Sequence, residues 1–210
     1  MATVLKATKP QMMPDGERVQ MILAAAERVF GAFGYGDATM EEVARDCGMA
    51  KKTVYRFFPD KVALFTALIA SHEHPDIHGS CGEDAGGRAA PVVLRTALLA
   101  IARFVLHPRQ LLMTRLVIAD GGLHPELSEQ FYRDCILKTH DDLARLLAPH
   151  LPQDVDPIEI ADILIGMSLG GLHLRALMTG CPAVDMEERL QARVSLAVDA
   201  ILALVAGKTR

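Results

Sequence analysis

The stretch "MEEVARDCGMAKKTVYRFFPDKVALF", residues 40–65, decides the fold of the N-terminal part of the chain. Its apolar and small residues suit two short helices over residues 40–47 and 51–57, joined by a tight turn. Ala44 lets the helices approach closely, Gly48 supplies the positive φ of the turn, and Val54 anchors the second helix from its inner face together with Phe58, four residues on. The stretch therefore predicts a helix-turn-helix packed through Ala44, Gly48, Val54 and Phe58.

The same stretch is locally cationic although the whole chain is acidic. The 210 residues carry a formal net charge of −4, yet residues 45–61 hold five Lys/Arg against two Asp/Glu. A local patch matters more than the total charge for nucleic-acid binding. A row of Lys, Thr, Tyr and Arg on a short helix fits the DNA major groove, whereas a merely solvated face is the alternative reading of the charges alone.

Two residues flank this row at helix starts. Thr39 begins "TMEE", the pattern of a capping box in which the Thr39 hydroxyl accepts from the Glu42 N–H, and that helix start can receive a phosphate. Lys61 opens the following helix, within reach of the DNA backbone. The predicted DNA contacts are Thr39, Lys51, Lys52, Thr53, Tyr55, Arg56 and Lys61.

The rest of the chain reads as helices separated by Gly- and Pro-containing breaks, with no persistent strand-like alternation. Half of the residues are hydrophobic and none is Trp. We expect an all-α protein with a flexible arm over residues 1–14, a three-helix helix-turn-helix domain over 15–71 and a second helical domain over 72–210. Helices are expected at 15–33 and from Asp60 towards Ser71, and then at 91–106, 109–119, 125–148, 157–179 and 185–206.

The residues around the cationic helix carry a family resemblance. "GYGDATMEEVARDCGMAKKTVYRFFPDKVALFTALI", residues 34–69, resembles the DNA-binding domain of the TetR/AcrR family of transcriptional regulators, and the resemblance covers about residues 15–70. Ala50 departs from the family pattern, where Ser often caps the helix, and Lys52 stands where Gly is common. Residues 111–134 more loosely resemble the C-terminal domain of the AefR-like subgroup.

The resemblance implies a function and an assembly. The chain is expected to be a DNA-binding transcriptional regulator, a repressor in the first instance, that binds a palindromic operator as a homodimer and is released by a small-molecule effector. The operator, the effector and the regulated genes are not specified by the sequence, and repressor is not separated from activator.

The C-terminal helices would then hold the effector pocket and the dimer interface. Glycines inside the helix at 157–179 are unfavourable and make sense where another backbone approaches closely. The last helix, at 185–206, presents a broad apolar stripe, and these two helices would form a four-helix seam across a two-fold axis; the alternative is that both pack inside one protomer. The predicted interface residues are Gly166, Gly170, Gly171, Leu190, Val194, Val198 and Ile201. The pocket candidates are Phe104, Met113, Leu116, Phe131, Cys135 and Met167, with His107, His140 and His173 as polar contacts; ordinary core is the alternative for each.

The sequence also bears on three other classes of protein: an enzyme, a metal sensor and a protein–protein adaptor. The sequence lacks G-x-S-x-G, GxGxxG, P-loop and H-E-x-x-H motifs, so an enzyme and a cofactor are not expected. "HEHPDIHGSC" offers His72, His74, His78 and Cys81 as donors for a metal sensor, without a strong metal motif. A helical protein–protein adaptor would not need the cationic row. The N-terminus has no signal-peptide pattern, no apolar run of spanning length lacks a charge, and four scattered cysteines suggest reduced thiols in the cytoplasm.

Overall fold

The computed structural model describes residues 13–71, 75, 77, 90–180 and 186–208, and the regular elements within them are all helices. The expected all-α fold class is therefore confirmed for these residues. The chain divides into two compact units, Met1–Leu68 and Ile69–Arg210.

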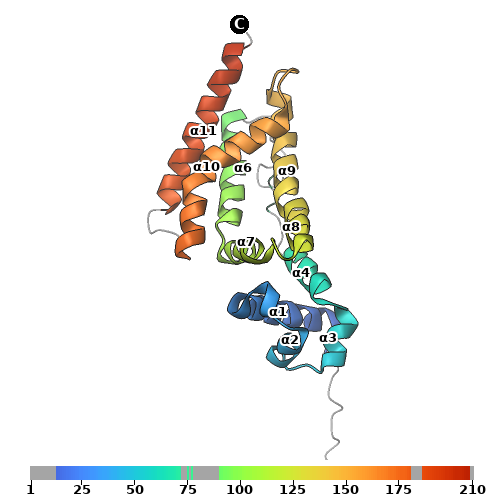
Figure 1. Cartoon of the computed structure of the whole chain (residues 1–210). Helices are drawn as coiled ribbons and strands as arrows, with labels where there is room; N and C mark the ends of the chain where they lie inside the picture. The colour runs from blue at the N-terminus through green and yellow to red at the C-terminus, as the bar shows by residue number, and fades with distance from the viewer. Residues whose placement is uncertain (1–12, 72–74, 76, 78–89, 181–185, 209–210) are drawn as a thin grey trace, which may run out of the picture. The chain divides into compact units, whose positions relative to one another are not determined.

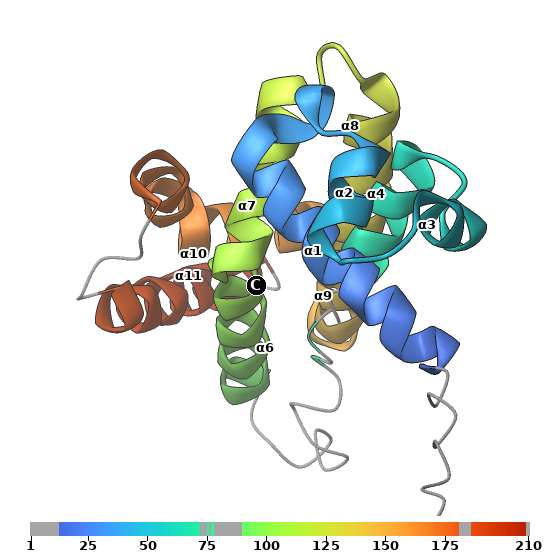
Figure 2. The ribbon, with the colours of Figure 1, turned by 90° about the horizontal axis from the view of Figure 1, so that it is seen from below.

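Four helices shape the first unit: α1 (Asp15–Asp37), α2 (Met40–Asp46), α3 (Lys51–Phe57) and α4 (Lys61–Ala70), whose last residues enter the second unit. α2 packs against both α1 and α3 (Figure 2). The helix expected to stop at Phe33 continues to Asp37, but Gly34 interrupts it with φ of +79°. Two helical pieces therefore meet at a kink at Gly34, one residue after the expected helix end, and glycine adopts such a positive φ readily.

Three aromatic rings form the centre of this unit. The ring of Phe65 lies edge-on to those of Phe30 and Tyr35, with centroids 5.9 and 5.4 Å away. Such edge-to-face geometry is favourable beyond the area that it buries. The rings tie α4 to the end of α1, so α4 completes the core on which the two short helices rest.

The second unit contains the remaining described helices (Figure 1). They are α6 (Ala90–Val105), α7 (Pro108–Asp120), α8 (Pro125–Phe131), the π-helical segment η2 (Tyr132–Leu137), α9 (Lys138–Leu147), the 3₁₀ turn η3 (Ala148–His150), α10 (Pro157–Thr179) and α11 (Met186–Lys208). The single helix expected at 125–148 is thus interrupted by a wider π turn, which sequence periodicity does not reveal.

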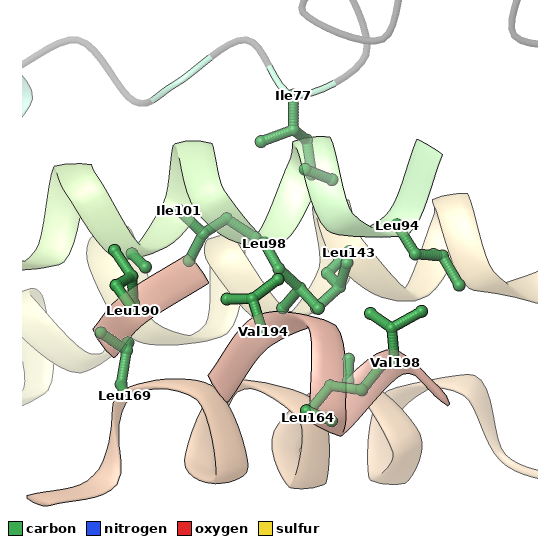
Figure 3. Packing of buried hydrophobic residues seen from close by; sticks show 14 of the residues in the cluster. Ile77, Leu94, Leu98, Ile101, Leu143, Leu164, Leu169, Leu190, Val194 and Val198 are labelled. Atoms are coloured by element: carbon green, nitrogen blue, oxygen red, sulfur yellow. The ribbon is translucent and has the colours of Figure 1, made fainter. Parts of the chain in front are cut away.

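The core of the second unit lies between α6, α9, α10 and α11, as Figure 3 shows. Leu98 of α6 and Leu164 of α10 are at most 1% exposed, and Val194 of α11 is fully buried. Burying an apolar side chain of this size stabilises the fold by about 1.5–3 kcal/mol relative to leaving it exposed. Arg95 and Arg103 of α6 also pair with Asp199 and Glu187 of α11.

Helix α10 is long and apolar enough to cross a membrane by length and composition alone. Its apolar window is 39% buried within the protein, and Ile160, Leu164 and Leu172 belong to the core just described. A core helix of a soluble protein passes the same test of length and hydropathy, so this property of α10 is explained by packing.

Candidate DNA interface and effector cavity

The start of α2 is held by the reciprocal cap that the "TMEE" pattern predicts. The Glu42 N–H donates to Thr39 Oγ1 at 3.2 Å, and the Thr39 N–H donates to Glu42 Oε2 at 2.9 Å. The Thr39 hydroxyl also donates to the same carboxylate oxygen, and these bonds hold the pKa of Glu42 below its usual value. Because the Thr39 hydroxyl already donates and accepts within the cap, it stabilises the helix before it meets any ligand.

The turn between α2 and α3 has the geometry of a helix-turn-helix. Gly48 has φ of +67°, and the Met49 N–H donates to the Ala44 carbonyl at 3.0 Å. Ala44, Val54 and Phe58 are 2%, 0% and 7% exposed. The inner face of α3 is therefore fixed on the core, so its outer face has one orientation. Ala50 at the start of α3 makes no side-chain cap.

The outer face of α3 presents Lys51, Lys52, Tyr55 and Arg56, all exposed, with Thr53 half-buried beside them. Two of the cations already have acidic neighbours. Lys51 Nζ lies 3.2 Å from Glu41 Oε1, and Arg56 Nη2 lies 3.0 Å from Asp15 Oδ1. Exposed ion pairs of this kind contribute about 0–1 kcal/mol, so a phosphate can replace either partner readily.

Lys52 differs from its neighbours. No ion pair or hydrogen bond of Lys52 is found among the residues that the structure describes. The Lys51 ammonium and the Tyr55 hydroxyl both bond to Glu41 and lower the pKa of that carboxyl. Lys52 is therefore the cation on this face whose charge is least neutralised by the protein itself.

Lys61 is predicted as a DNA contact, and in the structure its ammonium already has partners within the protein. Its Nζ donates to the carbonyls of Tyr35, Gly36 and Ala38 at 2.5, 2.9 and 3.1 Å. It also lies 4.5 Å from the centre of the Tyr35 ring. An ammonium has three donors, and all three are used at the end of α1. Lys61 therefore stabilises that helix end, and a contact with phosphate would compete with these bonds.

The second unit contains a cavity of about 120 Å³. Its wall comes from α6, α7, α8, η2, α9 and α10 and is mostly apolar. The lining residues are Phe104, Val105, Gln110, Thr114, Phe131, Cys135, Ile136, Thr139, His140, Ile165, Leu169 and His173. Largely apolar cavities with a few polar groups are typical ligand sites.

The cavity includes some of the predicted pocket residues and not others. Phe104, Phe131 and Cys135 line it, as do His140 and His173. Met113 and Leu116 are instead core residues, 2% and 6% exposed, and Met167 lies on the outside of α10 at 38% exposure. These three side chains are large and apolar, as pocket residues often are. Whether each one lines the cavity depends on the direction in which it points from its helix. His107 caps α7 through the Arg109 N–H and does not line the cavity.

Three polar residues of the wall, Gln110, Thr114 and Thr139, were missed by sequence reasoning. Gln110 and Thr139 are 5% and 8% exposed, two of the three buried polar side chains in the described part of the chain. A polar residue on the inner face of an apolar helix can be recognised in the sequence and indicates a site, because buried polar groups nearly always have a hydrogen-bond partner. Burial raises the pKa of the Cys135 thiol to about 11, and burial also lowers the pKa of His173.

Helix α10 is broken beside this cavity. Gly170 has φ of +25° and ψ of −116°, a non-helical conformation that kinks the helix. Arg193 of α11 binds the backbone just before this kink: its Nη2 donates to the Met167 carbonyl at 2.7 Å, and its Nε donates to the Ser168 carbonyl at 3.1 Å. Leu169 and His173 lie on opposite sides of the break and both line the cavity. The cavity wall therefore includes the kink.

The predicted dimer residues on α11 require a correction. Leu190, Val194, Val198 and Ile201 are 1%, 0%, 0% and 5% exposed in the single chain. They pack in its own core, so they are not available as a surface, and the alternative of packing inside one protomer holds for them. The three glycines of α10 are exposed. The exposed large apolar residues of these two helices are Ile158, Ile163, Met167, Leu174, Met178, Leu196 and Leu204.

The possible metal ligands His72, His74, His78 and Cys81 lie outside the described residues. Within the described part of the chain, no group of three or more His, Cys, Asp or Glu side chains is placed to hold a metal ion.

Comparisons with known proteins agree with this architecture. The family described as bacterial regulatory proteins, tetR family, matches residues 22–68, and the AefR-like transcriptional repressor C-terminal domain matches residues 92–204. The HTH-type transcriptional regulator SrpR of Pseudomonas putida is 41% identical over 59 residues, or 28% of each chain. The chain thus spans well under two thirds of that relative in the alignment.

Two further relatives are similar over most of the chain. The HTH-type transcriptional repressor Rv1474c of Mycobacterium tuberculosis is 29% identical over 165 residues, covering 75% of this chain and 81% of that one. A crystal structure of a TetR-family regulator from Mesorhizobium loti superposes with a TM-score of 0.77 at 26% identity, over 91% of this chain and 98% of that one. These relatives are transcriptional regulators and not enzymes. The chain belongs to the TetR family of bacterial DNA-binding transcriptional regulators, with a C-terminal part of the AefR-like type.

Proposed function

We propose that this protein is a cytoplasmic repressor that binds a two-fold symmetric operator as a homodimer and leaves it when a small molecule fills the cavity of the second unit. The observation that carries the proposal is the outer face of α3. Its exposed cations stand on a helix whose inner face is fixed by Val54 and Phe58, which is the arrangement needed for a helix that enters the major groove.

Lys52 is the residue that we expect to contribute most clearly as a phosphate contact. Its charge has no partner among the described residues, so DNA binding requires no ion pair of the protein to be broken. Lys51 and Arg56 would exchange Glu41 and Asp15 for phosphates. Each cation that neutralises one phosphate changes the slope of log K against log salt concentration by about one unit.

A homodimer is supported by the outside of α10. Gly166 and Gly171 have no atom within 4 Å of the position that a Cβ would occupy. The protomer itself therefore leaves room for a side chain at both positions, and a close approach by a second chain gives the glycines a purpose. Leu174 and Met178 lie farther along the same helix at 60% and 78% exposure. Exposed apolar surface of this kind marks an interaction site, and closed two-fold dimers are the commonest oligomers.

Effector release is supported by the double role of α10. Ile165, Leu169 and His173 line the cavity, while the exposed apolar residues of the same helix form the proposed interface. A ligand that prefers one position of α10 would shift the dimer between two states, and by linkage would lower DNA affinity by its preference between them, typically about 1–3 kcal/mol. The name of Rv1474c, a repressor, favours repression over activation.

The test is fluorescence anisotropy with DNA from the region upstream of the gene, against scrambled DNA, over a series of salt concentrations. We expect saturable binding that is far tighter to the upstream DNA. Lys52→Gln should weaken binding to both DNAs by a similar factor and reduce the salt slope by about one unit. The matched control is Lys138→Gln, an exposed lysine of α9, which should change neither. Absence of binding at low salt to any DNA tested would refute the proposal.

A further inference from the structure

The effector cavity has a size and a set of polar groups that restrict its ligand. This step rests on the proposed function, in that the cavity is taken as the effector site. At about 120 Å³ it is smaller than the roughly 300–1,000 Å³ of ordinary small-molecule sites. An engineered apolar cavity of about 150 Å³ in another protein takes up benzene. The space suits one six-membered ring with a small substituent, or a chain of similar volume, and a second, more open hollow shares Phe131 and Ile136 with it.

The wall carries no carboxylate, ammonium or guanidinium group among the described lining residues. The thiol of Cys135 is neutral at ordinary pH, since burial raises its pKa to about 11. His140 is the one ring whose nitrogens both face oxygens: Nδ1 is 2.7 Å from the Ile136 carbonyl and Nε2 is 3.1 Å from Asp162 Oδ1. A neutral imidazole has one N–H, and both contacts are hydrogen bonds only when the ring is protonated; in that form the ring already pairs with the Asp162 carboxylate. A charged ligand would therefore lose its hydration without gaining an unpaired counter-ion in the wall, which is unfavourable.

The two threonines of the wall restrict which hydrogen-bonding groups a ligand can use. Thr114 Oγ1 donates to the Gln110 carbonyl at 2.9 Å, and Thr139 Oγ1 donates to the Cys135 carbonyl at 2.6 Å. A hydroxyl has a single hydrogen, so both side chains have only acceptor lone pairs left. Any polar group of the ligand that meets them must be a donor.

His173 supplies the polar group without a partner. Its Nε2 is buried and makes no hydrogen bond within the protein, and burial lowers the pKa of the ring. A buried polar atom left unpaired is unfavourable by about 1–3 kcal/mol, so a ligand that pairs with it gains that difference. A hydroxyl group both donates and accepts, and it can satisfy this nitrogen in either tautomer.

The apolar part of the wall favours an aromatic ligand over an aliphatic one. Phe104 and Phe131 come from α6 and α8 and both line the cavity. Aromatic pairs are attractive beyond the area that they bury, by about 0.5–1.5 kcal/mol. An aromatic ring in the cavity could contact the phenyl groups and the aliphatic Leu169, since all three residues line it.

We propose that the effector is a neutral single-ring compound with a hydroxyl group, of the simple phenol class, whose hydroxyl pairs with His173 Nε2. Because Leu169 and His173 stand on either side of the break at Gly170, such a ligand contacts both halves of α10. It would therefore fix the angle of the kink. Because the same helix carries the proposed dimer surface, this angle would couple ligand binding to the arrangement of the dimer.

The test is isothermal titration calorimetry on the full chain without DNA, using four probes. p-Cresol has the proposed ring and hydroxyl, toluene lacks the hydroxyl, 4-methylbenzoate replaces it by a charge, and 2-naphthol adds a second ring. We expect p-cresol to bind about tenfold or more tightly than toluene, corresponding to the hydrogen bond to a buried acceptor. Both 4-methylbenzoate and 2-naphthol should bind more weakly than p-cresol.

Variants of His173 separate hydrogen bonding from packing. His173→Leu should bind toluene and p-cresol equally, and His173→Gln, whose amide reaches about as far as Nε2, should keep part of the preference for p-cresol. His150→Leu, an exposed histidine of η3, should behave as the unmodified protein. Circular dichroism checks that each variant is folded. If His173→Leu does not fold, His173→Gln alone tests the proposal. A folded His173→Gln protein that binds p-cresol and toluene equally would contradict it.

Other outcomes overturn the inference without touching the proposed function. Equal affinity for p-cresol and toluene, tighter binding of the carboxylate or of 2-naphthol, or no binding of any probe would each refute the assignment of a phenol. Operator binding measured separately by anisotropy stays as expected in these cases. Failure of operator binding in a protein that still takes up p-cresol would refute the repressor instead.

Discussion

The position of Lys61 leads to a prediction that distinguishes structural cations from DNA-binding ones. Its ammonium donates to the carbonyls of Tyr35, Gly36 and Ala38 at the end of α1. Replacing Lys61 by Met keeps the aliphatic stem and removes the charge. We expect this change to destabilise the first unit, whereas Lys52→Met, on the exposed face of α3, should leave its stability unchanged.

The magnitude follows from the contacts. A hydrogen bond to a charged group contributes about 1.5–3 kcal/mol net, but three carbonyls share one ammonium that is itself only partly buried, so their contributions do not add. The cation over the Tyr35 ring adds about 0.5–1 kcal/mol at an exposed site. In the Lys61→Met protein some of the freed carbonyls regain water. The expected loss in the free energy of unfolding is therefore about 2–4 kcal/mol.

The assay is urea unfolding of the full chain, followed by far-ultraviolet circular dichroism and by the near-ultraviolet signal of the tyrosines. The two units can unfold in two separate transitions. A Tyr35→Phe reference protein identifies the transition in which the Tyr35 signal is lost, and the variants are compared at that transition. The Lys52→Met protein serves as the matched control, because an exposed substitution away from special features changes stability by about 0.5 kcal/mol or less.

The DNA measurement completes the comparison. Lys52→Met should weaken operator binding with a lower salt slope, and Lys61→Met, measured at a temperature where it is folded, should keep the original slope. A different result would refute this reasoning: Lys61→Met leaves the stability unchanged and lowers the salt slope by about one unit. Lys61 would then contact phosphate in the complex instead of the carbonyls of Tyr35, Gly36 and Ala38.

Three other predictions concern the second unit. Leu174→Glu places a charge on the exposed apolar side of α10 and should convert a dimer to monomers in analytical ultracentrifugation, while Leu123→Glu, in the turn after α7, should not; two dimeric variants would refute the proposed interface. Arg193→Met leaves the Met167 and Ser168 carbonyls without their donor and should lower stability in urea by about 1–3 kcal/mol, with exposed Arg133→Met as the control that should change little. His173 has its pKa lowered by burial, so the unfolded chain binds its proton more readily and stability should fall as pH drops below about 6.5; thermal unfolding from pH 7.5 to 5 should show a smaller acid loss in His173→Leu, and equal losses would contradict the assignment.

The sequence was informative where local chemistry decides structure. The capping box at Thr39, the positive φ of Gly48 and the inward face of α3 follow from residue type and spacing, and the structure has each of them. Lys61 shows the limit of such reasoning. A lysine at the start of a helix reads as a free charge, and only the folding of α4 against the end of α1 brings three carbonyls to it.

The cavity was less accessible to sequence reasoning for a physical reason. A residue lines it or joins the core according to a rotation of about 100° around the helix axis, since successive residues of an α-helix differ by that angle. Met113 and Phe104 have the same apolar character, yet only Phe104 lines the cavity. The π turn of η2 adds a further rotation between Phe131 and Thr139, and no apolar periodicity reports it.

Helix α10 explains how a ligand this small can act on DNA binding at all. p-Cresol has about eight non-hydrogen atoms, and small ligands gain from about 0.3 to at most about 1.5 kcal/mol for each. Only the difference in affinity between two conformations changes the equilibrium, so about 1–3 kcal/mol of this total must depend on the angle of α10. Contacts on one half of a rigid helix would be equal in both states. Contacts with Leu169 and His173, which lie on either side of the Gly170 break, differ between the two states. A change in the angle of α10 alters the distance between these two residues. A ligand that touched only Phe104 and Phe131 would therefore bind without releasing DNA.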